Sequence, residues 1–495
     1  MIFSRLIALI RQVIHKLIPY KNIESVERVE TPLSNEMATA LDLWYAMYIN
    51  KSPWLKQDTV KSLNLPALIS SEIARQITIE MKWNITGKSK EGSDEDVMNP
   101  RAEYLKAEFE KLVRILRMKV EQGCAAGGMA IKPYRKGDHI YFDWIMDWSL
   151  YPIAFGDDGE LTDVIFPDVY VDGKVYYTRL ERHTLVGDDV KITQRVFKAN
   201  QPDSIGTEVP LSEVEQWSTL QPEIMVRNCG GPLFGWYKVA AANSVDVDSP
   251  MGASVYCKAV DVIRETDTQY SRLMWEYEGS ELAIDVDPTV LRPKKDGTGV
   301  EMPRLKERLF RGVDRGQDDS YEVFSPTIRD ASLVNGLNQN LMKVEDLCGL
   351  ARGTLSDSNV EARTATELRI VKQRSYSTVA DNQKALEICL KDVIRVMDRY
   401  ASIYGLAPEG EYEVSFEWDD SIITDTEQQL NERLVLLQNG IIGKAEFREW
   451  YFGETQSQAQ AAIAALTEEQ ASQMMDLESL LPKVPTAPTQ KTAQQ

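Results

Sequence analysis

The sequence predicts an α+β protein that is mainly helical and carries one antiparallel β meander. Apolar residues recur at helical spacing up to about residue 122, alternate at strand spacing from about 128 to 199, and return to helical spacing from about 253. The chain has 495 residues, 43% of them hydrophobic, which indicates two or three folded domains.

The first twenty residues, "MIFSRLIALIRQVIHKLIPY", form an apolar run that charged side chains interrupt. The run is too short and too charged to span a bilayer, and no small-residue cleavage site follows it. We interpret it as an amphipathic helix that docks on protein, with a helix lying on a membrane surface as the alternative.

Three further helices are predicted before the meander. "SNEMATALDLWYAMYIN" has one apolar face, and Ser34 or Asn35 can cap it. "LPALISSEIARQITIEM" predicts a mostly buried helix. "NPRAEYLKAEFEKLVRILRMKVEQG" has Asn99 at the cap, Pro100 at the first helical position and Gly123 at the expected end.

The meander is predicted from strand pairs joined by tight turns. "GMAIKPYRKGDHIYFDWI" turns at Lys136-Gly137, and "DVIFPDVYVDGKVYYTRLERHTL" turns at Asp172-Gly173. "VKITQRVFK" adds a further strand.

Helices dominate again after the meander. One is predicted from about Ala253 to Glu278 and another from near Asp330. The run "GLARGTLSDSNVEAR" then lacks large apolar anchors, which predicts a loop that changes conformation at low cost.

Thr364 and Glu367 match a capping box that starts a helix running to about Tyr404. A helix that runs from residue 364 to about residue 404 is long for a globular protein. It belongs either to a bundle or to a structure that spans layers of an assembly. A strand in "EYEVSFEWDDSI", more helical sequence and a disordered Pro/Thr/Gln tail complete the prediction.

Signatures of enzyme chemistry are missing. The five cysteines stand singly, the sequence has three histidines, and no phosphate loop, zinc-protease motif or nucleophile elbow occurs. Glu181 and His183 share one face of a predicted strand, where a hydrogen-bonded pair is the favoured interpretation over a metal site. The acid pairs Asp157-Asp158 and Asp419-Asp420 are interpreted as solvated turn residues. We therefore expect no enzyme activity, no cofactor and no metal.

Charge is unevenly distributed along the chain. The formal net charge is −20, which does not suit tight binding of nucleic acid. Residues 289–316 are an exception, with eight Lys and Arg against four Asp and Glu, a net of +4. This segment is predicted to contact acidic partners.

The order of these elements resembles that of bacteriophage portal proteins, in particular those of long-tailed phages that infect Gram-positive hosts. The resemblance covers roughly residues 33–480. The stretches that carry it, taken together in this order, are "SLNLPALISSEIARQITIE", "QGCAAGGMAIKPY", "TRLERHTL", "PLFGWYKVAAANSVDVDSPMGASVYCKAVDVI", "GLARGT…RTATEL" and "WDDSI".

The resemblance implies a portal fold of wing, stem, clip and crown. Its parts would be an N-terminal arm and wing (1–252), a stem helix (253–279), the clip (280–329), a second stem helix (330–349), the tunnel loop (350–363), a long helix from wing to crown (364–404), a wing strand with crown helices (405–480) and a disordered tail (481–495).

It also implies a function. Twelve copies would form a ring at one capsid vertex, assembled in the host cytoplasm, through which double-stranded DNA is packaged and ejected. The ring would dock the terminase large subunit, a head–tail adaptor and the major capsid or scaffolding protein. The alternatives are another capsid or tail structural protein, or a cytosolic hydrolase that uses paired carboxylates.

Two groups of site residues follow from the resemblance. The expected DNA-contacting residues of the tunnel loop are Arg352, Ser356, Asp357 and Arg363. The expected partner-docking residues of the clip are Lys294, Lys295, Arg304, Lys306 and Arg308. Because Asp357 and Glu361 also lie in the loop, the net sign of its contact with DNA stays open.

Overall fold

The computed structural model divides the chain into two units, Met1–Asp419 and Asp420–Gln495. The residues that it describes are 20–56, 59–87, 99–201, 204–280, 283–286, 292–293, 300–301, 310–312, 321–324, 327–357, 365–418, 426–452, 459–464 and 466. Helices and antiparallel sheets are both extensive, so the predicted α+β class is confirmed.

Three helices with the predicted starts form the centre of the first unit: α3 (Asn35–Tyr48), α4 (Leu65–Thr78) and α5 (Pro100–Ala126). Ser34 and Asn99 cap α3 and α5 by accepting backbone N–H groups at 3.1 and 2.8 Å. These caps satisfy amides that the first helical turn leaves without a partner.

The predicted end of α5 at Gly123 is wrong. Helix α5 continues through three buried residues and ends where Gly127 takes a φ of 96°. This left-handed conformation favours glycine, which explains the stop one turn later than predicted.

A three-stranded sheet with the order β10-β2-β3 packs on these helices. Strands β2 (Gly128–Lys136) and β3 (His139–Met146) pair across the predicted turn, and β10 (Gly235–Lys238) flanks β2. A Cβ at Gly235 would lie 2.2 Å from the carbonyl oxygen of Cys389, so the close packing of β10 on the long helix α8 requires glycine.

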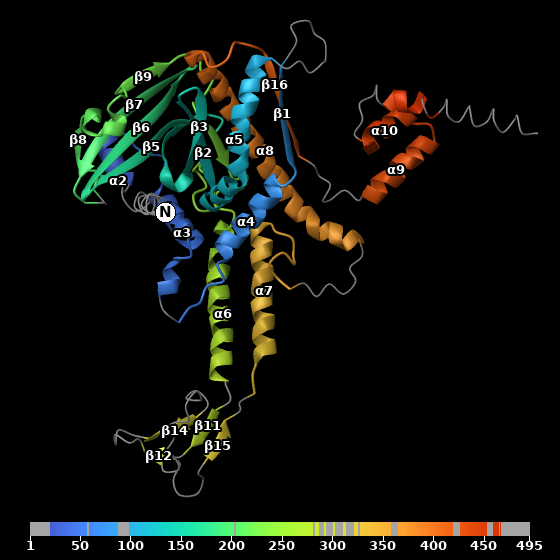
Figure 1. Ribbon diagram of the computed structural model, residues 1–495. Coiled ribbons are helices and arrows are strands. Elements are labelled where there is room, and N and C mark those ends of the chain that lie inside the picture. The colour runs from blue at the N-terminus through green and yellow to red at the C-terminus, as the bar shows by residue number, and fades with distance from the viewer. Residues whose placement is uncertain are drawn as a thin grey trace, which may run out of the picture. The chain divides into compact units, whose positions relative to one another are not determined.

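The prediction of a single meander is wrong, because its first strand pair, β2 and β3, belongs to the separate three-stranded sheet. The remaining strands form a larger antiparallel sheet with the order β4-β5-β6-β7-β8, in which β9 also pairs with β7 (Figure 1). The predicted hairpin is confirmed, because Asp172 pairs with Val175 across its turn. The strands are β4 (Tyr151–Phe155), β5 (Leu161–Asp172), β6 (Val175–Val186), β7 (Asp189–Ala199), β8 (Thr207–Val209) and β9 (Glu223–Val226).

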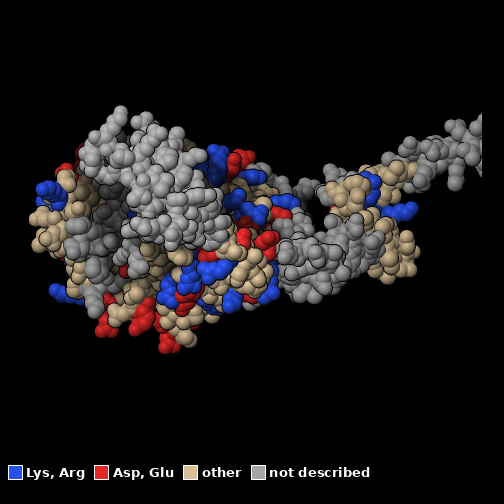
Figure 2. Space-filling model, turned by 90° about the horizontal axis from the view of Figure 1, so that it is seen from below, with Lys and Arg blue, Asp and Glu red and all other residues tan. Residues whose placement is uncertain are grey.

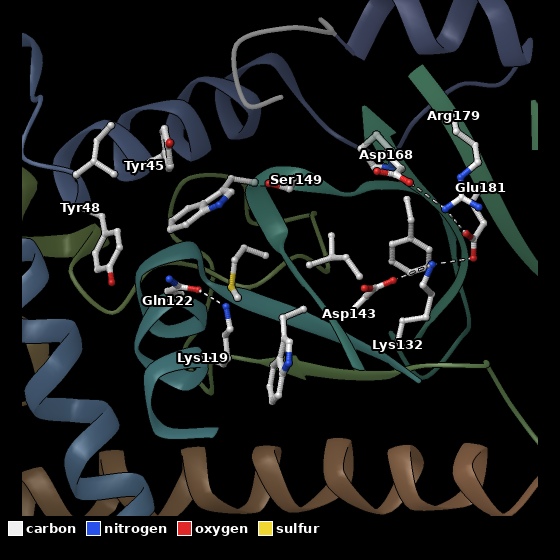
Figure 3. Close-up of a pocket in the computed structure, with 17 residues that line it drawn as sticks. Tyr45, Tyr48, Lys119, Gln122, Lys132, Asp143, Ser149, Asp168, Arg179 and Glu181 are labelled. Carbon is white, nitrogen blue, oxygen red and sulfur yellow. Dashed lines mark hydrogen bonds and ion pairs between the residues drawn. The ribbon is translucent and has the colours of Figure 1, made fainter. Parts of the chain in front are cut away.

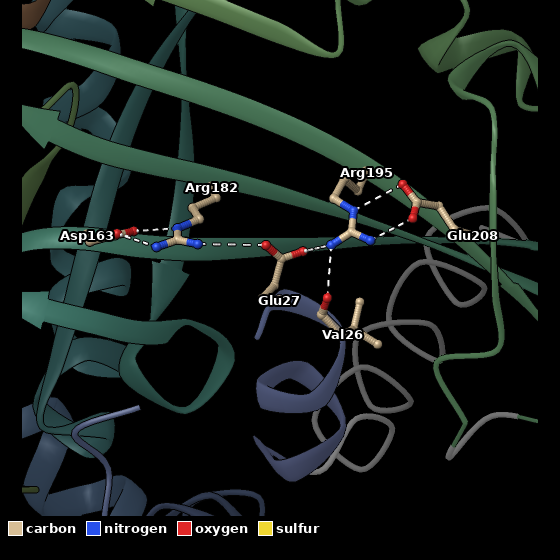
Figure 4. A network of polar contacts seen from close by, with 6 residues as sticks. All are labelled: Val26, Glu27, Asp163, Arg182, Arg195 and Glu208. Atoms are coloured by element: carbon tan, nitrogen blue, oxygen red, sulfur yellow. Dashed lines mark hydrogen bonds and ion pairs between the residues drawn. The ribbon is translucent and has the colours of Figure 1, made fainter. Parts of the chain in front are cut away.

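Helix α2 (Tyr20–Glu27) docks on this sheet through an apolar and a polar contact. Ile23 is fully buried among side chains of β4, β5, β6 and β7. Glu27 lies between Arg182 and Arg195, with a 2.9 Å contact to Arg195 (Figure 4). The predicted amphipathic helix before Tyr20 lies outside the described residues.

Helices α6 (Val260–Gly279) and α7 (Asp330–Cys348) lie side by side (Figure 1). The predicted start of the first at Ala253 is wrong. The N–H of Val255 donates to the carbonyl of Cys124 at 3.0 Å, so this segment bonds to the end of α5, and α6 begins after a 3-10 turn.

Short strands occupy the chain between α6 and α7. Their order is β14-β11-β15 in one sheet and β12-β13 in another. The bounds are β11 (Ala283–Val286), β12 (Arg292–Pro293), β13 (Val300–Glu301), β14 (Phe310–Gly312) and β15 (Tyr321–Phe324).

The long predicted helix is α8 (Ala365–Tyr404), which the sequence placed at 364–404. Its buried stripe includes Leu386, Leu390, Val393 and Met397. The side chains of the capping box Thr364 and Glu367 lie outside the described part of the chain.

Strand β16 (Tyr412–Trp418) follows α8 and pairs antiparallel with β1 (Met81–Gly87), a strand that the sequence did not predict. In the second unit, α9 (Thr426–Gln438) and α10 (Lys444–Phe452) confirm the expected helical sequence. Arg433 of α9 stacks over the ring of Trp450 in α10 at 4.6 Å. The predicted tail, residues 481–495, lies outside the described residues.

Candidate functional site at the end of helix α7

The first half of the predicted loop, residues 350–357, folds back on the end of α7. Gly349 ends the helix with a φ of 71°, and the N–H of Leu350 donates to the carbonyl of Glu345 at 2.9 Å. Leu350 is 2% exposed, and Leu355 packs against the main core. The expectation of a loop without apolar anchors is therefore wrong for this half, because two leucines anchor it.

A buried carboxylate of α7 binds the same turn through several hydrogen bonds. Glu345 is 0% exposed and accepts hydrogen bonds from the N–H groups of Gly353, Leu355 and Ser356 and from the Ser356 hydroxyl. The contacts from Ser356 N and Oγ are both 2.8 Å long. Four donors of the turn converge on this one carboxylate, so the turn is firmly fixed.

The end of the turn is fixed by a second side chain of α7. The Asn338 Oδ1 atom accepts from the N–H of Asp357 at 2.8 Å, and Asn338 Nδ2 donates to the Asp357 carbonyl at 2.9 Å. The backbone of Asp357 is thus held while its side chain stays exposed.

Arg352 lies on the surface of this turn and pairs with Asp346. Arg352 Nη2 and Nε donate to the two Asp346 carboxylate oxygens at 2.8 and 3.2 Å. The hydrogen bond and charge of Asp346 raise the pKa of Arg352 above its usual value. The side chains of Arg352 and Asp346 are 52% and 32% exposed, so solvent can reach the pair.

The predicted site residues therefore differ in their exposure to solvent. Arg352 and Asp357 are exposed at the turn. Ser356 is 7% exposed and directs its hydroxyl to Glu345, so its hydroxyl does not face the surface. Arg363 and the predicted clip residues Lys294, Lys295, Arg304, Lys306 and Arg308 lie outside the described residues.

Sequence reasoning missed the residues that hold the turn. One signal was present, because Leu341, Glu345 and Cys348 follow the helical spacing of one face. A carboxylate on an otherwise apolar stripe indicates a buried acceptor with specific partners.

A similar contact joins the C-terminal end of α6 to the N-terminal end of α7. Glu276 of α6 accepts from the N–H, Nε and Nη2 groups of Arg329, which precedes α7, with the Nη2 contact at 2.7 Å. One carboxylate thus binds both the backbone amide and the guanidinium of the residue that precedes α7. The contact ties the two helices together beside the segment that connects them.

A cavity of about 450 Å³ between α3, α5, β3, β5 and β6 offers a second candidate site (Figure 3). Lys132, Arg179 and Glu181 point toward one another at its wall, with Lys132 Nζ 2.8 Å from Glu181 Oε1. Asp143 and Asp168 complete the group at 3.7 and 3.2 Å from Lys132 and Arg179. Each of these charges has an opposite charge beside it, which favours a structural role.

The residues that the sequence offered for metal binding or hydrolysis have structural roles where they are described. His183 Nε2 lies 2.8 Å from Glu181 Oε1, which confirms the predicted hydrogen-bonded strand pair. Asp158 accepts from the N–H of Glu160 in the turn between β4 and β5. Asp419 and Asp420 lie outside the described residues.

Two kinds of feature are absent from the part of the chain that the structure describes. No group of three His, Cys, Asp or Glu side chains there could hold a metal ion. None of its helices is long and apolar enough to cross a membrane.

Acidic and basic side chains are interspersed over the described surface in the view from below (Figure 2). Within residues 345–357 the side chains that solvent reaches are net acidic, because Asp346 and Asp357 accompany the cation Arg352. A surface of this kind does not bind phosphate tightly.

These features describe a protein of mixed α and β elements, with a paired-helix region that ends in an anchored turn. The chain matches the model of one protein family, described as phage portal protein, SPP1 Gp6-like, over residues 56–474. It therefore belongs to this family of phage portal proteins, as its sequence pattern predicted. The search of curated proteins gave no match. Portal proteins are structural components of the virion that act in DNA packaging and connect head and tail.

Proposed function

We propose that copies of this chain form a dodecameric ring at one capsid vertex, and that DNA is packaged and ejected through its channel. The observation that supports this function best is the paired helices α6 and α7, which end in the turn that Glu345 and Asn338 anchor. Repeated around an axis, such a pair would line a channel, and the turn would form its narrowest part.

The parts of the chain have distinct roles in this proposal. Helices α6 and α7 are the stem, residues 280–329 the clip, and 350–363 the tunnel loop. The sheets with helices α2–α5 are the wing, and α8 leads from the wing to the crown at 405–480. The expected partners are the terminase large subunit, a head–tail adaptor and the major capsid or scaffolding protein, and the ring would assemble in the host cytoplasm.

Within the tunnel loop, Arg352, Asp357 and Arg363 are the proposed contacts to DNA. The ion pair with Asp346 limits the charge that Arg352 offers to a phosphate. Contact with DNA is then weak and independent of sequence, which suits a duplex that must slide.

The double substitution Arg352→Ala and Arg363→Ala tests the ring and the loop together. We expect negative-stain images of wild type and variant to show the same rings with a central hole. DNA packaged per capsid should fall about tenfold or more in the variant, because each lost charge-assisted contact is repeated in every copy. A pore-less particle in the wild type would refute the proposed function, and normal packaging in the variant would refute the role of the two arginines.

The basic clip is tested by reversing its charge. Replacing Lys294, Lys295 and Arg304 by Glu should weaken co-precipitation of terminase or adaptor about tenfold, because acidic surfaces on the partners would then be repelled. Ring formation should be unchanged. Equal recovery of both partners with the reversed clip would contradict this assignment.

A further inference from the structure

We propose that Glu345 is the positioning residue of the tunnel loop, which couples the turn 350–357 to stem helix α7 so that the two move as one body. This inference rests on the proposed function, because it concerns how the loop is presented to DNA. Its physical basis is the single carboxylate that collects three backbone N–H groups and one hydroxyl from the turn.

The position of Glu345 is costly for the helix that carries it. It lies in the last turn of α7, where the helix dipole is negative and disfavours a carboxylate. The side chain is also fully buried, which removes the hydration of its charge. Helix formation alone gives no reason for a glutamate here, so the turn that it binds provides the reason.

The hydrogen bonds are divided unequally between the two oxygens. Oε1 accepts from the three amides of Gly353, Leu355 and Ser356, and Oε2 accepts from the Ser356 hydroxyl and, at 3.3 Å, from the Gly353 amide as well. Ser356 is buried and Leu355 is half-buried, so leaving their amides without an acceptor is unfavourable. The turn cannot separate from α7 without losing these contacts together. The Gly353 amide also donates to Ser356 Oγ at 3.2 Å, within the turn.

Arg352 lies between Leu350 and Gly353, which are both bonded to Glu345, so its position is fixed by theirs. The N–H of Gly353 is bound to Glu345, and the Arg352 side chain pairs with Asp346 on the same helical turn. A shift or rotation of α7 therefore carries Arg352 with it. Stem motion during translocation would move the DNA contact directly.

The inference is tested with three variants of the full chain. Glu345→Met keeps a similar side-chain volume but removes the acceptor. Glu345→Gln keeps the amide-binding Oε1 position and removes the charge. Asp346→Asn is the matched control, because it weakens the exposed pair with Arg352 and leaves the buried anchor in place. Hydrogen exchange of the amides of 353, 355 and 356, ring formation and packaged DNA are measured for each.

Exchange at the amides of Leu355 and Ser356 should become about tenfold faster or more in Glu345→Met, since both amides lose their acceptor. The Gly353 amide should change less, because it also donates to Ser356 Oγ. Rings should form, and packaged DNA should fall about tenfold, because Arg352 is no longer fixed. Glu345→Gln should restore most of both values, and Asp346→Asn should leave exchange unchanged. Should Glu345→Met not fold, Ser356→Ala takes its place and should raise exchange and lower packaging to a smaller degree.

Several results would overturn the inference. Protected amides in Glu345→Met would show that the carboxylate does not hold the turn, as would unchanged exchange in Ser356→Ala when that variant is needed. Loosened amides with normal packaging would show that the anchor does not matter for translocation. Equal loss of packaging in the Gln and Met variants would assign the effect to charge and not to position. Failure of the wild type to form rings would refute the proposed function, while the exchange data would still decide whether Glu345 holds the turn.

Discussion

Replacing Asp147 by Asn should raise the free energy of unfolding by about 4 kcal/mol at pH 8. Asp147 is fully buried, Oδ1 accepts from Trp236 Nε1 at 3.1 Å, and Oδ2 has no hydrogen-bond partner among the described atoms. Burial raises its pKa from 3.8 to about 7, although the bond from Trp236 and the charge of Lys238 act in the opposite direction. Each pKa unit corresponds to about 1.4 kcal/mol, which gives the expected gain.

The pH dependence identifies the cause of this gain. Because the folded-state pKa is the higher one, the Asp147 contribution is fully present below about pH 3.8 and is lost as the pH rises through about 7. The advantage of the Asn variant should therefore shrink to about 2 kcal/mol or less at pH 5.

Chemical denaturation followed by tryptophan fluorescence at pH 8 and pH 5 measures both values. Asp157→Asn, at an exposed turn, is the control and should change stability by less than about 0.5 kcal/mol. A gain of equal size at both pH values would show that ionisation of Asp147 is not the origin.

Replacing Glu181 by Gln should lower the free energy of unfolding by about 3–5 kcal/mol at pH 7, because it leaves the buried Lys132 without its close partner. Burial alone would raise the pKa of the Glu181 carboxyl. The charges of Lys132 and Arg179 and the hydrogen bond from His183 outweigh burial and hold this pKa well below its usual value.

The sign of the pH effect is opposite to that of Asp147. A lowered folded-state pKa means that the contribution of Glu181 is present above about pH 4.5 and is lost as the pH falls below it. The difference between wild type and Glu181→Gln should therefore shrink in acid. Adding Lys132→Met to the variant should recover part of the stability at pH 7, since an apolar side chain needs no counter-charge. No recovery in this double variant would contradict the buried-pair explanation.

Local signals in the sequence were sufficient for most helices and hairpins. Ser34 and Asn99 cap their helices as predicted, because a cap depends on amides only two or three residues away. The turn at Gly173 was predictable for the same reason. The order of these elements also sufficed to predict the portal family.

Contacts between distant parts of the chain set the limits of prediction. Strand β1 was missed because its partner β16 lies more than three hundred residues later. The late start of α6 was missed because the segment before it packs on the end of α5. Val255 donates to the Cys124 carbonyl, and a Cβ at Gly252 would lie 2.0 Å from the Gly127 carbonyl oxygen. Helical spacing does not reveal these contacts.

The candidate site was less predictable than the fold. The resemblance pointed to the loop that follows α7, but it did not distinguish the buried Ser356 from the exposed Arg352. That distinction depends on Glu345, which looks like an ordinary helix residue unless the turn is seen folded onto it.

The carboxylate of Glu276 in α6 binds Arg329, so the chain is held together where the segment between α6 and α7 begins and ends. The two ends of this segment are thereby joined by a contact that involves none of the residues in between. With this contact in place, insertions and replacements in the intervening segment should be tolerated, because the flanking chain keeps its own hydrogen bonds. If residues 280–329 are the clip, as proposed, changes of sequence there should leave the pairing of α6 and α7 intact.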